Sequence, residues 1–257
     1  MNDQDLTARI ELGGAIVRDA AVMALDYFNR RETLTIDTKK NAQDLVSEAD
    51  RNVETLIRDG LAKAFPNDGM LGEEHGLQAG TSGWRWIIDP IDGTAPYLHG
   101  LRSWSISVAV VRGDDIMAGW IAEPCAGRLY HAAKGRGAWQ DDRRLTASKA
   151  TSMTEGLTAI GSGDADKISR LVHGILSSGG NFQRNGSAAL SLAHTAAGHY
   201  LGFVEPVLSP WDCAAGLLMV SEAGGYHIPH PLDRPAPVLA CAAGVADALK
   251  DVIAAAE

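Results

Sequence analysis

A short apolar run, Trp86-Ile-Ile88, leads directly into the acidic turn Asp89-Pro-Ile-Asp92-Gly-Thr94. Pro90 stiffens the turn and Gly93 permits close approach of the backbone, so two carboxylates three positions apart can converge on one point. Two buried like charges persist near neutral pH by sharing a proton or by holding a cation. Oxygen-only ligands select hard ions such as Mg²⁺. Taken alone, the segment is more typical of an Asx-turn at a strand end than of a metal site.

The first half of the chain has the pattern of two amphipathic helices followed by a sheet. Apolar residues recur at helical spacing from Asp5 to Phe28, and Ser47 to Asp50 has the form of a capping box before a helix that Pro66 ends. Runs rich in β-branched and aromatic residues then predict strands at 69–72, 86–88, 103–112, 116–123, 128–132 and 135–139. This half is expected to be α+β, with two helices packed on an antiparallel sheet.

The second half alternates strands and helices, which favours a mixed or parallel sheet flanked by helices. Strands are expected at 157–161, 200–204 and 238–242, and helices at 164–176, 187–197, 211–222 and 245–255. The polar stretch from Thr146 to Gly156 indicates a boundary between two lobes of one compact unit. The expected lobes are residues 1–147, with most of the acidic motifs, and residues 148–257.

The acidic balance of the chain argues against a nucleic-acid partner. The formal net charge is -9 at pH 7, whereas nucleic-acid binders usually carry a basic face. An acidic chain that bound an anionic ligand would have to recruit cations, which hints at a metal site, but a net charge of this size more often reflects only solubility. No apolar run approaches the ~20 residues that span a bilayer, the N-terminal segment lacks a secretory pattern, and the three cysteines form no disulfide framework. We therefore expect a cytoplasmic protein without a membrane partner.

Three separated motifs resemble those of the inositol monophosphatase family. They are Gly72-Glu-Glu-His75, Trp86 to Thr94, and Trp211-Asp-Cys-Ala-Ala-Gly216 continuing to Gly225, in the order of the family. In addition, Lys39 to Asp50, with Asp44, is similar to the mobile metal-loop segment of the family, and Arg184 to Ala189 is similar to its substrate-side helix start. The resemblance covers nearly the whole chain. It implies a layered α/β/α/β/α sandwich of the inositol monophosphatase and fructose-1,6-bisphosphatase type, and a Mg²⁺-dependent, Li⁺-sensitive phosphatase.

The resemblance also implies roles for individual residues. Two to three Mg²⁺ ions would be held by Glu73, Asp89, the backbone carbonyl of Ile91, Asp92 and Asp212, with Asp89 bridging two of the ions. The attacking water would be positioned or deprotonated by Asp50, Thr94 and Glu73. The phosphate would be bound by the backbone N–H groups of Gly93 and Thr94, and further substrate-side residues would be Arg184, Gly186, Ser187 and Glu205.

Several of these residues also have a purely structural interpretation. Asp50 is a good capping residue, and Asp212 is well placed to complement a helix dipole. Arg184 could contact a phosphate or a dimer interface, and a surface salt bridge is an equally typical role. Glu205 matches a position that hydrogen-bonds a hydroxyl or amine of the substrate, and the competing interpretation is a solvated loop carboxylate. Glu74, next to Glu73, is expected to be a neighbour and not a ligand.

The substrate is the open part of the resemblance. After Asp-Gly-Thr the family commonly continues with Asn-Phe, whereas this chain has Ala95-Pro96, so the wall beside the substrate is expected to differ. Among the candidate activities, hydrolysis of inositol 1-phosphate is favoured, because Glu205 is present and no basic pocket for a second phosphate is evident. The alternatives are a histidinol-phosphate phosphatase, a 3'(2'),5'-bisphosphate nucleotidase, and a regulatory binding protein without activity. A homodimer is expected.

Overall fold

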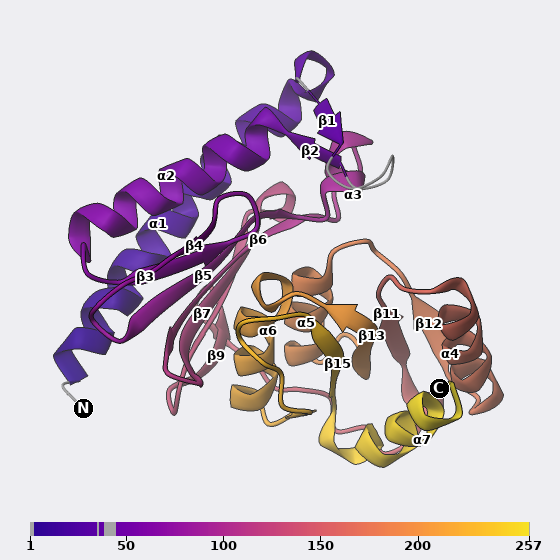
Figure 1. Cartoon of the computed structure of the whole chain (residues 1–257). Helices are drawn as coiled ribbons and strands as arrows, with labels where there is room; N and C mark the ends of the chain where they lie inside the picture. Colours follow the sequence, from indigo (N-terminus) through magenta and orange to yellow (C-terminus); the bar gives the residue numbers. More distant parts are fainter. Residues whose placement is uncertain (1–2, 35, 39–44, 257) are drawn as a thin grey trace.

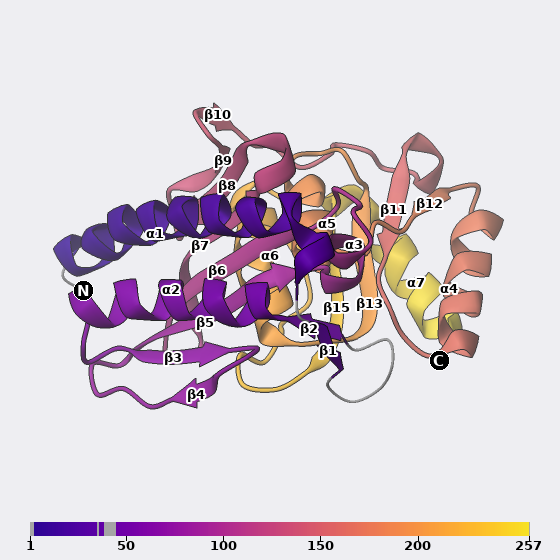
Figure 2. The same ribbon diagram turned by 90° about the horizontal axis from the view of Figure 1, so that it is seen from above.

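A computed structural model describes residues 3–34, 36–38 and 45–256 of the chain. Its helices and two sheets form five layers, which Figures 1 and 2 show from two directions. Helices α1 (Asp3–Asn29) and α2 (Glu48–Ala64) form the first layer, α5 (Ala188–Ala196) and α6 (Pro210–Glu222) lie between the sheets, and α4 (Ala165–Ser177) and α7 (Ala246–Ala256) form the last. The predicted α/β/α/β/α sandwich is confirmed.

The first sheet has eight strands in the order β10-β9-β8-β7-β6-β5-β3-β4. Its strands are β3 (Gly69–Gly72), β4 (Gly76–Gln78), β5 (Trp84–Asp92), β6 (Ser105–Arg112), β7 (Asp115–Glu123), β8 (Arg128–Ala133), β9 (Gly137–Gln140) and β10 (Arg143–Arg144). Strand β3 runs parallel to β5, so the prediction of an antiparallel sheet is wrong here. The chain turns back at β4 on the outer edge of β3 and reverses again before β5, and two reversals leave β3 and β5 parallel.

The second sheet has five strands in the order β12-β11-β13-β15-β14 and is mixed, as expected. Its strands are β11 (Leu157–Ile160), β12 (Asn181–Gln183), β13 (Gly202–Leu208), β14 (Tyr226–His227) and β15 (Ala236–Cys241). Two short strands, β1 (Ile36–Thr38) and β2 (Leu45–Ser47), pair with each other outside both sheets, and the short helix α3 (Thr94–Leu98) also lies outside them. The 3-10 turns are Arg31–Thr33, Pro124–Ala126, Met153–Glu155 and Ala243–Val245. Within the part of the chain that the structure describes, no helix is both long and apolar enough to cross a membrane.

Three apolar cores hold the layers together. One lies between α1, α2 and the first sheet, where Val17, Val53 and Ile57 are fully buried. The second fills the space around α5 and α6 between the sheets, and the third joins the second sheet to α4 and α7. Because α6 packs on both sheets, the acidic residue at its beginning lies at the seam between them.

Strand β5 is longer than predicted and passes through both of its aspartates. Side chains three positions apart on a regular strand point to opposite faces. The pairing of β5 with β6 is interrupted between Asp89 and Asp92, which is the kind of irregularity that redirects side chains. This local break explains how both carboxylates reach one site from a single strand.

A buried ion pair fastens α1 to the sheet at the opposite end of β5. Arg9 Nε and Nη2 donate to Asp68 Oδ2 at 2.9 Å and Oδ1 at 2.8 Å, and the guanidinium stacks over Phe65 and Trp84. Ser82 Oγ and Trp86 Nε1 also donate to Asp68. Removing one partner of such a pair leaves an unpaired buried charge.

We expect Asp68→Asn to lower the free energy of unfolding by roughly 3 kcal/mol, because Arg9 loses its buried counter-ion. Urea unfolding followed by tryptophan fluorescence measures the change. An unchanged midpoint would contradict this role of the ion pair.

Candidate active site

Asp89, Asp92 and Asp212 come together where the end of β5 meets the beginning of α6. One carboxylate oxygen from each lies within 4.8 Å of the other two. Asp89 and Asp92 are buried, and Asp212 is half-buried. The convergence expected from the sequence is therefore present, with two acids supplied by the strand and one by the helix.

Asp89 has one oxygen anchored and one available. Its Oδ1 accepts a hydrogen bond from the backbone N–H of Ile91 at 3.0 Å. Its Oδ2 is buried without a hydrogen-bond partner. A buried, unpartnered carboxylate oxygen is costly unless a cation or a proton satisfies it.

Asp92 is held by the beginning of α5. Its Oδ2 accepts hydrogen bonds from Ser187 Oγ, from the Ala189 N–H at 2.8 Å and from Ser105 Oγ at 3.2 Å. Its Oδ1 accepts from the Ala188 N–H at 3.2 Å and keeps capacity for a further partner. Ser187, expected on the substrate side, thus contacts a site carboxylate directly.

Asp212 combines capping of α6 with membership of the acidic group. Its Oδ2 accepts from the backbone N–H of Ser209 at 3.3 Å, as in a capping box. The two interpretations left open by the sequence are therefore compatible, because the capping bond is made by one of the two carboxylate oxygens.

The pKa values of the three acids are raised because burial disfavours their charged forms. After burial, the next largest causes of the raised pKa of Asp89 are the negative charges of Glu73, Asp212 and Asp92. For Asp212, the next largest cause is the negative charge of Asp92. Burial raises the pKa of Asp92 to about 6, although the donors from Ser187 and the backbone oppose the shift. Crowded acidic oxygens with raised pKa values fit a hard divalent cation, which would replace the shared protons.

Asp50 and Thr94 are in contact beside the cluster. Thr94 Oγ1 donates to Asp50 Oδ1 at 3.3 Å, and the carbonyl of Ile91 lies 3.2 Å from the same hydroxyl. Asp50 Oδ2 accepts from Ser47 N at 2.8 Å and Ser47 Oγ at 2.7 Å, which forms the predicted capping box. Gly93 is the N-cap residue immediately before α3 and has a φ of 93°, a conformation that favours glycine.

Glu73 lies in the turn after β3 and is half-buried. Its backbone N–H donates to the carbonyl of Ile88 at 3.2 Å, and its charge contributes to the raised pKa of Asp89. It does not belong to the group of three acids within 4.8 Å. Lys39 and Asp44 of the expected metal-loop segment lie outside the described residues.

A cavity of about 190 Å³ adjoins the acidic cluster. Asp92 and Asp212 line it together with the expected substrate-side residues Arg184, Gly186, Ser187 and Glu205. Among the described residues that line it, Arg184 is the one cationic side chain.

Glu205 is not a solvated loop residue, because it lies on β13 and is only 4% exposed. Its Oε1 accepts from Ser162 N at 3.0 Å and Ser162 Oγ at 2.7 Å. Burial raises the pKa of Glu205 to about 7, and the nearby charge of Asp92 adds to the effect. A Cβ at position 161 would overlap Glu205, so Gly161 makes room for the carboxylate.

Sequence reasoning missed the residues that hold the acids in place. Ser105 and Ser162 anchor Asp92 and Glu205, and Glu54 contacts the turn that carries Glu73. The weak signal for Ser105 is a small polar residue at the beginning of a largely apolar strand. Glu54 gave no signal, because a glutamate on an amphipathic helix is ordinarily solvated.

Known proteins resemble this chain in sequence and in structure. The profile of the inositol monophosphatase family matches residues 5–255. Inositol-1-monophosphatase of Rhizobium meliloti is 39% identical over 218 residues, 82% of this chain and 81% of that protein. Nus factor SuhB of Xylella fastidiosa is 35% identical over 81% of this chain and 77% of that protein. Histidinol-phosphatase of Chlorobaculum parvum is 32% identical over 86% of this chain and 85% of that protein. The crystal structure of suhB from Bartonella henselae superposes with a TM-score of 0.90 at 30% identity, covering 97% and 98%.

Proposed function

This chain belongs to the inositol monophosphatase family of metal-dependent phosphatases and is a phosphoric monoester hydrolase, and from this premise we propose that it hydrolyses inositol 1-phosphate to inositol and phosphate. The observation that carries the substrate proposal is the cavity beside Asp92 and Asp212, which is lined by buried Glu205 and, among the described residues, by one cationic side chain, Arg184. A small polyol with one phosphate fits a wall of this kind.

We assign the metal sites to the residues whose oxygens remain available. Glu73, Asp89, the carbonyl of Ile91, Asp92 and Asp212 would hold two to three Mg²⁺ ions. When bound, such ions neutralise the phosphate, lower the pKa of water and stabilise the leaving alkoxide. The unpartnered Oδ2 of Asp89 supports a role for this residue as a ligand.

Asp50 and Thr94 would handle the proton of the attacking water. Thr94 Oγ1 accepts that proton while its own proton passes to Asp50 Oδ1, which lies 3.3 Å away. Asp50 stays fixed through its other oxygen, which accepts from Ser47. A base hydrogen-bonded to the group that it deprotonates supports general-base catalysis, and such bonds commonly shorten when substrate binds. Glu73, which is close enough to raise the pKa of Asp89 through its charge, would orient the same water.

The remaining substrate-side roles are proposed from the family resemblance for Gly93 and Thr94 and from the lining of the cavity for the other residues. The backbone N–H groups of Gly93 and Thr94 would bind the phosphate, with Gly186 and Ser187 forming the adjacent wall. Glu205 would bond a hydroxyl of the substrate, because a carboxyl with a pKa of about 7 can donate as well as accept. A bisphosphate needs a second cationic contact, and the described lining offers only Arg184. This disfavours the bisphosphate nucleotidase alternative.

A substrate panel separates the remaining alternatives. Purified protein with Mg²⁺ is assayed on inositol 1-phosphate, histidinol phosphate and an adenosine bisphosphate. We expect the highest kcat/KM on inositol 1-phosphate, dependence on millimolar Mg²⁺, and inhibition by Li⁺. A preference for histidinol phosphate would replace the substrate proposal, and silence on all three would favour the binding role that the name of the Nus factor relative raises.

Replacing Glu205 by glutamine distinguishes a hydroxyl from an amine. Glutamine keeps hydrogen bonds to hydroxyls and loses the charge that attracts an ammonium group, and a charged hydrogen bond contributes about 1.5–3 kcal/mol. We expect KM to change less than about 3-fold for inositol 1-phosphate and to rise about 10-fold or more for histidinol phosphate. Nitrophenyl phosphate, which has no aliphatic hydroxyl or amine, is the control. A large rise in KM for inositol 1-phosphate alone would contradict the assigned role of Glu205.

A further inference from the structure

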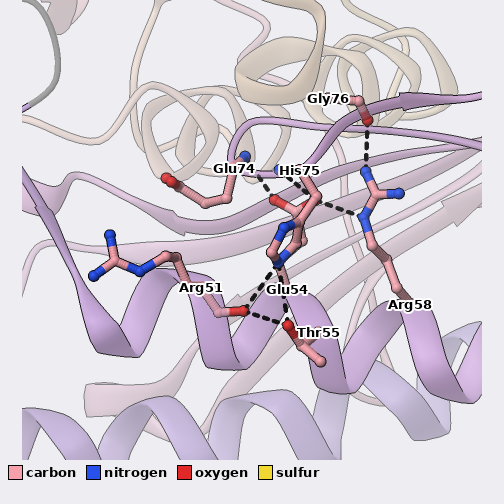
Figure 3. Close-up of polar contacts among 7 residues, drawn as sticks. All are labelled: Arg51, Glu54, Thr55, Arg58, Glu74, His75 and Gly76. Carbon is pink, nitrogen blue, oxygen red and sulfur yellow. Dashed lines mark hydrogen bonds and ion pairs between the residues drawn. The ribbon is translucent and has the colours of Figure 1, made fainter.

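Helix α2 carries a completely buried carboxylate, Glu54, that faces the turn following β3. Its side chain is 0% exposed, and the partner guanidinium of Arg58 is 11% exposed. Glu54 Oε2 accepts from the backbone N–H of Glu74 at 2.8 Å, and Oε1 accepts from the N–H of His75 at 3.3 Å. Figure 3 shows the carboxylate lying beneath these two residues.

Two neighbouring side chains of α2 tie down the same turn. Arg58 Nε donates to Glu54 Oε1 at 2.6 Å, and Arg58 Nη2 donates to the carbonyl of Gly76 at 2.6 Å. Thr55 Oγ1 and His75 Nε2 are 3.1 Å apart and hydrogen-bonded. The segment from Glu74 to Gly76 is thereby attached to the helix at three successive residues.

Gly72 is required for this arrangement. A Cβ at this position would overlap Glu54 Oε1 and approach Arg58 Nη2 to 2.9 Å. The glycine therefore lets the carboxylate lie directly against the end of β3. Immediately after it, Glu73 is fixed from the other side, since its N–H donates to the carbonyl of Ile88 in β5.

The backbone of Glu73 is thus held on both sides. Its own N–H bonds to β5, and the N–H groups of the next two residues, Glu74 and His75, bond to Glu54. A carboxylate that contacts a metal loses affinity when the shell that orients it is loosened. We propose that Glu54, paired with Arg58, is a positioning residue that fixes the backbone of Glu73 for divalent cation binding. The inference depends on the ligand role proposed for Glu73.

The position of Glu54 on α2 adds a geometric reason. Asp50 lies one turn earlier on the helix and accepts from Thr94, whereas Glu54 accepts from the turn beyond Glu73. One rigid helix therefore sets the distance between the proposed water-activating pair and the proposed metal ligand. A residue that only stabilised the lobe would have no such connection to the site.

The test measures binding of Mg²⁺ alone by calorimetry, with thermal unfolding of the metal-free protein in parallel. In Glu54→Gln one acceptor oxygen becomes an NH₂ group that meets a backbone donor or the guanidinium. We expect Mg²⁺ affinity to fall about 10-fold or more. In a Glu73→Gln background the same substitution is expected to change affinity less than 2-fold, because the group on which it acts has been removed.

Asp68→Asn is the matched control, since Asp68 is also a buried acid paired with an arginine on this sheet. It is expected to lower the unfolding temperature while Mg²⁺ affinity stays within 2-fold of wild type. Arg58→Lys is the second variant, in case Glu54→Gln does not fold. A lysine ammonium donates from a single nitrogen and does not reproduce the fork whose Nε bonds Glu54 and whose Nη2 bonds the Gly76 carbonyl, so affinity is expected to fall about 3-fold or more.

The outcomes separate the two proposals. If Glu73→Gln weakens Mg²⁺ binding whereas Glu54→Gln and Arg58→Lys do not, the positioning role is overturned and the ligand assignment stands. If Glu73→Gln leaves binding unchanged, the ligand assignment fails and takes the positioning role with it. Equal losses from Glu54→Gln with and without Glu73 would also overturn the positioning role, since they would show that Glu54 acts elsewhere.

Discussion

Asp89→Asn is expected to lower kcat by at least about 100-fold and, at the same time, to stabilise the metal-free protein at pH 7. The loss is expected because Asp89 is the proposed bridge between two ions, and even outer partners of a metal site contribute 10–100-fold. The gain is expected because asparagine removes a buried charge that burial and three neighbouring acids disfavour. Activity assays and thermal unfolding without metal measure the two effects.

Asp92→Asn provides the contrast. The Oδ2 atom of Asp92 faces donors from Ser105, Ser187 and Ala189, so an NH₂ group in its place would meet donors and not acceptors. Asp89 Oδ2 has no donor to lose. We therefore expect both variants to lose activity and only Asp89→Asn to gain stability. A destabilised metal-free Asp89→Asn protein would contradict the charge crowding on which the metal proposal depends.

Local sequence signals were sufficient for the elements that present the site. The Ser47 capping box, the helix beginning before Asp212 and the strand before Asp89 all lie where the pattern indicates. Each of these depends on residues within a few positions of one another, so periodicity and capping rules apply. The meeting of Asp212 with Asp89 rested instead on the family resemblance, because it depends on packing between two sheets.

Features that depend on contacts between distant segments were not predictable in this way. The parallel pairing of β3 with β5 depends on which edge of β3 the short strand β4 occupies. Glu54 looks like a surface residue until the turn after Gly72 is placed over it. The bond from the Ser187 hydroxyl to Asp92 also depends on such a contact, because it forms where α5 begins against β5 and β6.

The stability of the metal-free protein is expected to fall as the pH rises from about 4 to 7. Asp92 has an ordinary pKa of 3.8 and a folded pKa of about 6, and Glu205 shifts from 4.5 to about 7. Between these values the folded state binds more protons than the unfolded state, so raising the pH favours unfolding. Shifts of this size correspond to about 3 kcal/mol for each group. Urea unfolding in EDTA across this range measures the fall.

The Glu205→Gln variant separates the contribution of Glu205 to this pH dependence from that of Asp92, and Mg²⁺ tests whether a cation offsets the loss of stability. Saturating Mg²⁺ binds the folded state and offsets the loss near pH 7 by an amount that grows with the logarithm of its concentration. Glu205→Gln removes the part of the slope between pH 4.5 and 7 that belongs to Glu205 and leaves the part that belongs to Asp92. A metal-free protein equally stable at pH 4.5 and 7 would mean that the acids are not crowded in the folded state. The physical case for a cation at this site would then be lost, because nothing in the fold would favour replacing their protons.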